Sequence, residues 1–372
     1  MERAELTALL RATGCAVERE GNFFLRDPKR GAVAISAAGT GSERGWLMIP
    51  SGGTSGALKF ARHDERTLGA AVEGFCTHFG LGRVNAVDVL PAHHVSGLMA
   101  RVRCATTGGA HVAWEWKRLE TGETPALRGG SDWVISLVPT QLQRLLASPE
   151  AMAWLRGFKI VFVGGGPVWP ELADAAARAE LRVSLSYGMT ETAAMVAALR
   201  PEEFLNGARS SGRALPHARL TVTAAGTVGV EGESVFRGYF PEWRAGRVFE
   251  TEDLAHCDAQ GHWHILGRRD ALIITGGEKV NPAEVEAALR ATGEFADVAV
   301  VGVPDAEWGE RVVACYPAGG VAPDLARVAA GLGALAGRQR PKSYVALADW
   351  PRNALGKADR VALAAAARRA LG

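Results

Sequence analysis

The chain has 372 residues, of which 48% are apolar and 22% are charged, and its formal net charge is +2. A chain of this length and composition can bury a large core and form two or more domains, which excludes disordered and fibrous proteins. Because positive and negative charges nearly balance, the composition gives no general reason to expect a nucleic-acid partner.

The amino-terminal segment and the cysteines indicate the compartment. Residues 1–5 carry acidic charge where a secretory signal has basic charge followed by an apolar run. No stretch of the sequence approaches the roughly 18 apolar residues of a membrane span. The five cysteines are odd in number and include no CxxC pair, so a reduced protein is the simplest interpretation. We therefore expect a soluble protein of the cytoplasm.

Helical patterns alternate with short apolar runs along much of the chain. The first helix that the pattern defines follows Asp64, a suitable N-cap, and ends at Gly80, a suitable C-cap. Its apolar face is formed by Leu68, Val72, Phe75 and Phe79. A later helix is predicted to begin at Pro282, after the cap Asn281. The predicted strands are residues 86–90, 133–138, 159–163, 181–185 and 298–303. This alternation predicts an α/β fold.

The pattern changes twice toward the carboxyl end of the chain. Residues 207–246 combine glycines with β-branched residues, which predicts a small β-rich subdomain. After residues 267–270 the pattern restarts as strand, turn, helix and strand. We therefore place a domain boundary at Asp270, with a large domain over residues 1–269 and a small α+β domain over residues 270–372.

Segment 51–59 combines three glycines with three hydroxyl side chains and ends in Lys59. Glycines let backbone amides approach a ligand closely, and hydroxyl and ammonium groups bind phosphate oxygens, so this loop could hold the β and γ phosphates of a nucleotide. It is not a Walker A loop, because Lys59 follows the last glycine by three residues and no Ser or Thr comes next. The alternative is a plain surface loop. The candidate phosphate-binding residues are Ser51, Gly52, Gly53, Thr54, Ser55, Gly56 and Lys59.

A second candidate segment follows the strand predicted to end at Leu185, a position where α/β sheets place ligand groups. Its candidate residues are Tyr187, Gly188, Thr190 and Glu191. The carboxylate of Glu191 could hold Mg²⁺ against the phosphates of ATP, and the alternative is a surface acid at the start of a helix. Upstream, Gly165 lies in a glycine run after another predicted strand, where a flat base can lie on the backbone.

Three charged positions farther along the chain suit the same nucleotide. Asp253 offers a carboxylate that can accept hydrogen bonds from both ribose hydroxyls, and Arg268 offers a guanidinium that can donate to them. The alternative for this pair is a surface salt bridge. Lys357 lies in a predicted loop, where its ammonium could reach negative charge that develops on the α phosphate. The alternative for an isolated lysine is a solubilising side chain.

In this order and spacing, the segments resemble those of the ANL superfamily of acyl-CoA synthetases, peptide-synthetase adenylation domains and luciferases. The match runs from about Met48 to Arg360. The resemblance implies an adenylate-forming fold with a mobile carboxy-terminal domain. It also implies a two-step reaction, in which a carboxylate and MgATP give an acyl adenylate and a thiol such as CoA then displaces AMP.

The resemblance also implies a role for each candidate residue. Segment 51–59 would bind pyrophosphate, and Thr190 and Glu191 would contact phosphate and Mg²⁺. The nucleotide would be lined by Gly165, Tyr187 and Gly188, and its ribose would be bound by Asp253 and Arg268. The resemblance further implies that Asp270 is the hinge, that Gly276 and Gly277 line the tunnel for the thiol, and that Lys357 acts in adenylation.

Some features depart from the family pattern. Leu58 stands where the family usually has proline, and Glu252 stands where it usually has glycine, but neither change removes a charged group. About 50 residues precede the phosphate loop, fewer than the family generally has. We therefore expect a shortened amino-terminal subdomain, which leaves open its share of the acyl pocket and any homodimer surface.

Within the superfamily, residues 90–99 and 190–218 resemble 2-succinylbenzoate:CoA ligases of menaquinone and phylloquinone biosynthesis. This resemblance implies that His94, Ser96 and Gly188 contact the acyl substrate. A helix that begins near Ser96 places Arg103 on the same face, where its guanidinium could pair with a second carboxylate of the substrate. The alternative is an arginine on the helix surface.

The sequence therefore predicts an acid:CoA ligase that uses ATP, Mg²⁺ and CoA and acts on 2-succinylbenzoate. Two alternative enzyme activities stay open: a ligase for another acyl or aryl acid, and an enzyme that loads a carrier protein. A third alternative is a nucleotide-binding protein without catalytic activity.

Overall fold

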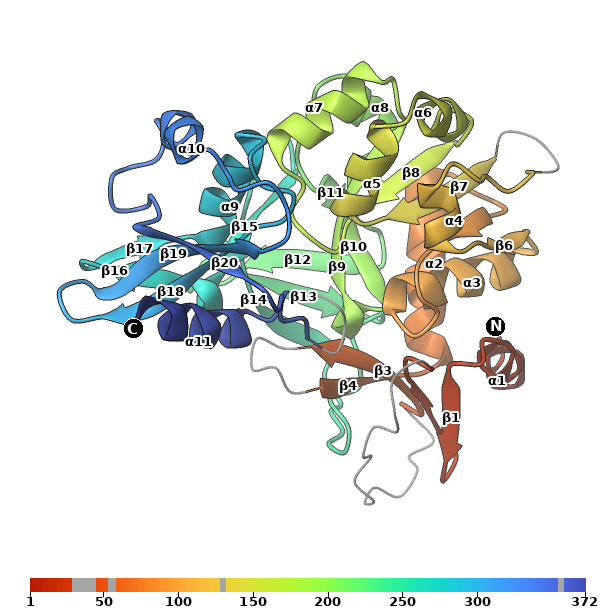
Figure 1. The fold of residues 1–372 in the computed structure, drawn as a ribbon. Coiled ribbons are helices and arrows are strands. Elements are labelled where there is room, and N and C mark those ends of the chain that lie inside the picture. The colour runs from red at the N-terminus through yellow and green to blue at the C-terminus, as the bar shows by residue number, and fades with distance from the viewer. Residues whose placement is uncertain (29–44, 53–57, 128–131, 354–357) are drawn as a thin grey trace. The chain divides into compact units, whose positions relative to one another are not determined.

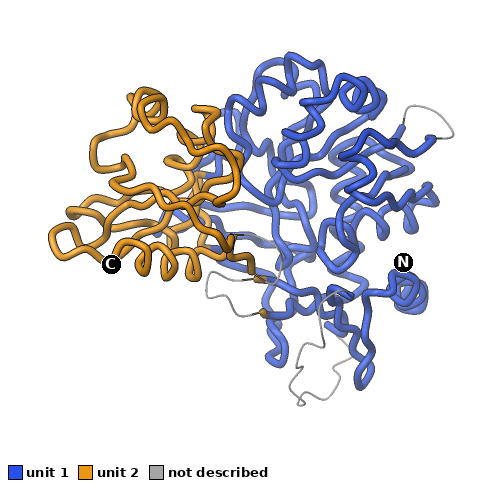
Figure 2. Tube along the Cα trace, viewed as in Figure 1, with its two compact units in different colours: residues 1–51, 59–251, 256–265 blue, residues 52–58, 252–255, 266–372 orange. Residues whose placement is uncertain are grey.

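The computed structural model describes residues 1–28, 45–52, 58–127, 132–353 and 358–372. Its residues form two compact units, shown in different colours in Figure 2. Unit 1 comprises residues 1–51, 59–251 and 256–265, and unit 2 comprises residues 52–58, 252–255 and 266–372. The boundary that the sequence predicts at Asp270 stays a prediction. Among the described residues, no helix is long and apolar enough to cross a membrane.

The main sheet of unit 1 has the strand order β11-β10-β9-β8-β7-β5-β6 (Figure 1). Its strands are β5 (Asn85–Asp88), β6 (His111–Ala113), β7 (Trp133–Leu137), β8 (Ile160–Val163), β9 (Val183–Met189), β10 (Ala194–Ala198) and β11 (Arg213–Ala214). The five strands from β6 to β9 pair in parallel, whereas β10 and β11 are antiparallel to their neighbours. Four of the five apolar strands predicted from the sequence lie in this sheet, the fifth, at residues 298–303, lies in unit 2, and the α/β class is confirmed.

Unit 1 contains helices before the first strand of this sheet and between its successive strands. They are α1 (Arg3–Ala12), α2 (Glu65–Phe79), α3 (Val95–Thr107), α4 (Trp116–Glu120), α5 (Pro139–Leu146), α6 (Pro149–Leu155), α7 (Pro170–Arg178) and α8 (Pro201–Leu205), with a short 3₁₀ helix, η1 (Thr190–Thr192). The helices α2 and α3 pack against each other and against β10, and α3 also packs against β5. One face of the sheet therefore faces these two helices.

Helix α2 begins and ends where the sequence predicts. Asp64 Oδ1 accepts hydrogen bonds from the backbone N–H groups of Arg66 and Thr67, at 3.1 and 2.9 Å. Gly80 ends the helix with φ of +63°, a conformation that glycine adopts without steric cost. On the predicted apolar face, Leu68, Val72 and Phe75 are buried and Phe79 is half-buried. Local capping chemistry therefore sets both helix ends.

Strand β9 extends four residues beyond the predicted end at Leu185. Its last residues pair with β10, where Met195 lies opposite Gly188. A Cβ atom on Gly188 would lie only 2.0 Å from the carbonyl oxygen of Ala194 and 2.5 Å from the Cα of Met195. Glycine at this position therefore permits the close approach of the two strands, a constraint that the isolated strand pattern did not contain.

The other strands that precede residue 269 form two smaller sheets. One has the order β1-β2-β3-β4, with β1 (Ala16–Arg19), β2 (Asn22–Leu25), β3 (Leu47–Gly52) and β4 (Leu58–His63). The other has the order β12-β13-β14-β15, with β12 (Ala218–Val222), β13 (Thr227–Gly232), β14 (Val248–Cys257) and β15 (Trp263–Arg268). The hairpin of β12 and β13 lies within the segment predicted to be β-rich.

Unit 2 contains the predicted restart of strand, turn, helix and strand. Its elements are η2 (Arg269–Ala271), β16 (Ile273–Thr275), β17 (Glu278–Val280), α9 (Pro282–Ala291), β18 (Ala299–Asp305), β19 (Gly309–Pro317), α10 (Leu325–Gly331), β20 (Ser343–Leu347) and α11 (Arg360–Leu371). The sheet order is β17-β16-β19-β18, and β20 pairs with β19. Asn281 Oδ1 accepts a hydrogen bond from Ala283 N at 3.1 Å, which confirms the predicted cap of α9.

Alternate residues of the central strands of unit 2 pack on opposite faces of its sheet. Val300 and Val312 belong to the core that includes residues of α9 and α10. Val301 and Val313 belong to a second core that includes residues of α11. Unit 2 is therefore a sheet with helices on both faces, as the period of two in β-strands requires.

Candidate active site

Glu191 is a buried acidic residue in η1, directly after β9, and it is only 7% exposed. Its Oε1 atom accepts hydrogen bonds from the hydroxyl of Ser51 at 2.6 Å and from the phenol of Tyr239 at 2.7 Å. The alternative of a surface acid is therefore wrong. The structure brings Ser51 and Glu191, two candidate residues from separate segments, into direct contact.

The turn that carries Glu191 is stabilised by hydrogen bonds of the Thr192 side chain, and it contains two unusual backbone conformations. The Thr192 hydroxyl, which is buried, lies 2.7 Å from Ala194 O and 3.2 Å from Met189 N. Ala193 and Ala194 have φ values of +53° and +88°, which non-glycine residues rarely adopt. Such conformations persist where the surrounding structure over-determines them, often at ligand sites.

Tyr239 reaches Glu191 because its segment pairs with β4. Arg62 N donates to Gly238 O and Phe240 N donates to Phe60 O, each at 2.9 Å. This pairing also brings the ammonium of Lys59 to 5.2 Å from the centroid of the Tyr239 ring, within range of a cation–π interaction. Sequence reasoning missed Tyr239, because its place depends on this long-range pairing and no short motif marks it.

His63 fastens β4 to the turn that carries Glu191. Its Nε2 atom lies 2.8 Å from the carbonyl oxygen of Thr190, and its Nδ1 atom lies 3.0 Å from the Thr67 hydroxyl. Burial lowers the pKa of His63 to about 4, so the imidazole is neutral near pH 7. Because a carbonyl can only accept, the proton of the neutral ring lies on Nε2. The backbone of Thr190 is thus held in place by an uncharged hydrogen bond.

The residues predicted to line the nucleotide lie at strand ends of the main sheet. Gly165 follows β8 and has φ of +76°, and a Cβ there would meet only Val138 at 3.9 Å. Tyr187 and Gly188 lie on β9, and Tyr187 is buried. These positions are at the carboxyl ends of parallel strands, where open α/β sheets bind ligands. Their contacts with a nucleotide stay a prediction.

In unit 2, Arg268 lies between two carboxylates. It donates through Nε and Nη2 to both oxygens of Asp270, at 2.9 and 2.7 Å, and its Nη1 lies 3.5 Å from Asp253 Oδ1. The ion pair that formed the alternative explanation for Asp253 and Arg268 is therefore present, and the predicted hinge residue joins it. Arg268 and Asp253 are 41% and 17% exposed, so the pair can still meet a ribose from solvent.

The candidate glycines of the thiol tunnel form the turn between β16 and β17. Gly276 and Gly277 have φ values of +55° and +80°, as a two-residue hairpin turn with both central residues left-handed requires. Gly276 O accepts a hydrogen bond from Arg338 Nη1 at 2.9 Å, and a Cβ on Gly276 would lie 2.8 Å from the Trp308 ring. Other candidates fall outside the described residues, namely Gly53, Thr54, Ser55, Gly56 and Lys357.

Helix α3 carries the candidates for the acyl substrate. His94 is its N-cap residue and Ser96 lies in its first turn. Arg103 is only 4% exposed, so the alternative of a surface arginine is wrong. Its guanidinium carbon lies 4.0 Å from the centroid of the Phe75 ring. Its Nε and Nη2 atoms are buried without a hydrogen-bond partner among the described residues.

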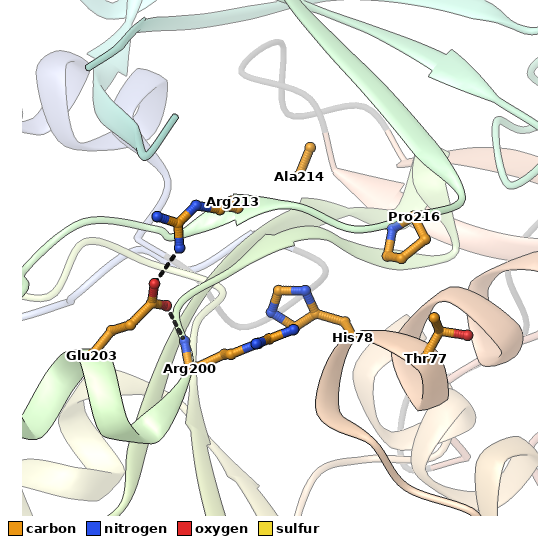
Figure 3. Close-up of a pocket in the computed structure, with 7 residues that line it drawn as sticks. All are labelled: Thr77, His78, Arg200, Glu203, Arg213, Ala214 and Pro216. Carbon is orange, nitrogen blue, oxygen red and sulfur yellow. Dashed lines mark hydrogen bonds and ion pairs between the residues drawn. The ribbon is translucent and has the colours of Figure 1, made fainter. Parts of the chain in front are cut away.

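A separate cavity of about 320 Å³ lies in unit 1 (Figure 3). Its lining residues are Thr77, His78, Arg200, Glu203, Arg213, Ala214 and Pro216. Glu203 accepts hydrogen bonds from Arg213 and from the backbone N–H of Arg200, so the carboxylate in the cavity is already paired. None of the residues predicted to bind substrates lines this cavity.

The Glu191 carboxylate fits a Mg²⁺ ion that is shared with a phosphate ligand. The hydrogen bonds from Ser51 and Tyr239 both end on Oε1, so Oε2 could serve as a cation ligand. No cluster of three or more acidic, histidine or cysteine side chains suited to a metal occurs in the part of the chain that the structure describes. Mg²⁺ is commonly bound by one or two protein carboxylates, with phosphates and water completing its coordination.

Comparison with known proteins identifies the family. The family of AMP-binding enzymes matches residues 33–240, and the AMP-binding enzyme C-terminal domain matches residues 284–357. An indoleacetate–CoA ligase from Aromatoleum aromaticum is 31% identical, over 92% of this chain and 69% of that protein. A 2-succinylbenzoate–CoA ligase from Enterococcus faecalis is also 31% identical, over 83% of this chain and 67% of that protein.

A solved structure shows the same fold. The o-succinylbenzoate CoA synthetase (MenE) from Bacillus subtilis, in complex with the acyl-adenylate intermediate OSB-AMP, superposes with a TM-score of 0.74 at 25% identity. The superposition covers 86% of this chain and 69% of that one. The chain therefore belongs to the AMP-binding enzyme family, the adenylate-forming ANL superfamily, and within it to the AMP-forming CoA ligases.

Proposed function

We propose that this enzyme adenylates 2-succinylbenzoate with MgATP and transfers the acyl group to CoA, as menaquinone or phylloquinone biosynthesis requires. The similarity to the E. faecalis and B. subtilis proteins supports this substrate. Indoleacetate, the acid named for the A. aromaticum relative, is the competing candidate. The two acids differ in one decisive group, because 2-succinylbenzoate has a second carboxylate and indoleacetate has none.

The buried guanidinium of Arg103 favours 2-succinylbenzoate over indoleacetate as the substrate. Burial lowers its pKa to about 10, which still leaves it charged at neutral pH. A buried charge without hydrogen-bond partners is costly, and its Nε and Nη2 are both unpartnered within the described chain. A second substrate carboxylate would accept from both atoms in a bidentate pair. Indoleacetate would leave the guanidinium without such a partner.

The residues around Glu191 would bind the triphosphate. Mg²⁺, held by the Glu191 carboxylate, would neutralise phosphate charge when it is bound. Ser51 and Tyr239 orient that carboxylate through their hydrogen bonds to Oε1. Segment 51–59, including Lys59, would bind pyrophosphate, and Thr190 would contact phosphate.

The other candidate residues would bind the rest of the nucleotide and the thiol. Gly165, Tyr187 and Gly188 would line the adenine, and Asp253 and Arg268 would bind the ribose. Lys357 would stabilise the negative charge that develops as the substrate carboxylate attacks the α phosphorus. A rotation about Asp270 would then exchange Lys357 for the turn of Gly276 and Gly277, which would admit CoA for the second step.

The test is a panel of acids incubated with ATP and Mg²⁺, with and without CoA, in which pyrophosphate, AMP and thioester are measured. The proposal expects the highest kcat/KM with 2-succinylbenzoate and a CoA thioester as product. A higher kcat/KM with indoleacetate would overturn the proposed substrate. Pyrophosphate release without any CoA thioester would favour carrier-protein loading, and ATP binding without turnover would favour a non-catalytic protein.

A further inference from the structure

A second polar side chain without partners lies near Arg103. His217 follows β11 in unit 1, and both of its ring nitrogens are buried without a hydrogen-bond partner in the described residues. Burial is the main cause that lowers the pKa of His217 to about 4, and the charge of Arg103 is the next largest. The ring is therefore neutral near pH 7, with one N–H donor that nothing in the described chain satisfies.

Helix α2 brings His217 and Arg103 to the same place. Gly74 lies so close to the His217 ring that a Cβ on this glycine would be 1.9 Å from Nδ1 and 2.6 Å from Cγ. The next residue, Phe75, contacts the Arg103 guanidinium through its ring. Two consecutive residues of one helix thus support two neighbouring side chains, each with unsatisfied hydrogen-bonding groups.

We propose that His217 is a second recognition group for the distal carboxylate of the acid substrate. The carboxylate would pair with the Arg103 guanidinium and accept a further hydrogen bond from the N–H of His217. This inference rests on the proposed function for the identity of the acid. It adds a specificity-determining residue that the sequence motifs did not contain, and it gives Gly74 a role in seating the imidazole.

Three variants separate recognition from folding. His217→Phe keeps a ring of similar size and removes both nitrogens, so the substituted side chain itself buries no unpartnered polar atom. Gly74→Ala adds a methyl group where the ring of His217 lies. Gly69→Ala is its matched control, because Gly69 lies in the same helix and a Cβ there meets no atom within 4 Å. Both alanine changes gain the same helix propensity.

The kinetic test compares 2-succinylbenzoate with 4-oxo-4-phenylbutanoate, which is the same acid without the ring carboxylate. A lost hydrogen bond to a charged group should lower kcat/KM for 2-succinylbenzoate about tenfold in His217→Phe, mainly through KM. Gly74→Ala should act in the same direction, and Gly69→Ala should match wild type. Neither His217→Phe nor Gly74→Ala should change kcat/KM for the analogue more than about twofold. Equal losses with both acids, or no loss with either, would overturn the inference.

A binding measurement keeps the inference separate from the proposed function. If wild type turns over neither acid, the proposed substrate fails, but benzoate still presents the ring carboxylate. Benzoate should shift the imidazole NMR signals of His217 in wild type, which are identified by their absence in His217→Phe. Benzamide, which has no charge, should leave them in place. Imidazole signals that do not respond to benzoate would overturn the role of His217 whatever the enzyme acts on.

Discussion

Arg237 and Asp64, which are 173 positions apart in the chain, form an ion pair inside unit 1, with Arg237 Nε 3.2 Å from Asp64 Oδ2. Their side chains are only 9% and 4% exposed. The other carboxylate oxygen of Asp64 caps α2, and the backbone N–H of Arg237 donates to Arg62 O at 2.8 Å. One carboxylate therefore fixes both the start of α2 and the segment that leads to Tyr239.

Asp64→Ala should lower the free energy of unfolding by about 3 kcal/mol, because it removes a helix cap and one anionic partner of a buried arginine. Ser148→Ala is a suitable control, since Ser148 caps α6 through a hydrogen bond from Ala151 N at 3.2 Å without a buried ion pair. The control should lose about 1 kcal/mol. Urea unfolding measures both variants, and equal losses would show that the ion pair contributes little.

What could be predicted from the sequence depends on the range of the contacts involved. The caps of α2 and α9 follow from short-range chemistry, and both were predicted correctly. Tyr239 and Arg237 could not be found in this way, because their positions depend on pairing with β4 and on Asp64. The true end of β9 was also missed, since it depends on the close approach of β10 at Gly188.

The partners of Glu191 illustrate the same division within the site. The Ser51 and Glu191 positions were predicted from separate motifs, but their hydrogen bond joins residues 140 positions apart, and only the fold shows it. Arg103 was predicted to recognise a carboxylate, and the structure adds that it is buried with unpartnered nitrogens. His217 could not be predicted as a binding residue, because a single histidine outside any motif cannot be distinguished from other histidines by sequence.

Tyr239→Phe should weaken the use of MgATP with little effect on folding. The change removes the hydroxyl that donates to Glu191 Oε1 and keeps the ring that contacts Lys59. We expect kcat/KM for ATP to fall about tenfold at limiting Mg²⁺, the size expected for one hydrogen bond to a charged group. Steady-state pyrophosphate release at several Mg²⁺ concentrations measures this.

The control for this change is Tyr316→Phe, in β19 of unit 2, where the ring packs against Phe295 with centroids 5.6 Å apart. It should leave kcat/KM for ATP unchanged. A Tyr239→Phe enzyme with wild-type dependence on both ATP and Mg²⁺ would show that the phenol does not orient Glu191 for metal binding.

Lys357→Ala should separate the two half-reactions. The proposed role of the ammonium is confined to adenylation, so pyrophosphate release should be abolished while CoA thioester formation from a supplied acyl adenylate should be largely retained. Lys342→Ala is the control, because the Lys342 ammonium donates to Gly337 O at 3.2 Å within unit 2 and has no proposed role in either step. Equal loss of both half-reactions in Lys357→Ala would refute the role.

The buried imidazole of His63 should make stability fall on mild acidification. Its pKa is about 4 in the folded protein, against about 6.5 for an unperturbed histidine, and burial is the main cause. Above pH 6.5 both states hold the neutral ring, so the shift has no effect. As pH falls from 6.5 toward 4, the unfolded state binds a proton that the folded state does not, and folding weakens. The total effect is about 3 kcal/mol at pH 4 and below.

His63→Gln tests this argument, because glutamine offers an amide N–H that can donate to Thr190 O but does not titrate. Urea unfolding of wild type and variant at several pH values between 7 and 4 gives the difference in slope, in which contributions from His78 and His217 cancel. The variant should lose less stability than wild type across this range. Parallel curves for wild type and His63→Gln would mean that His63 takes up a proton in the folded protein as readily as in the unfolded chain.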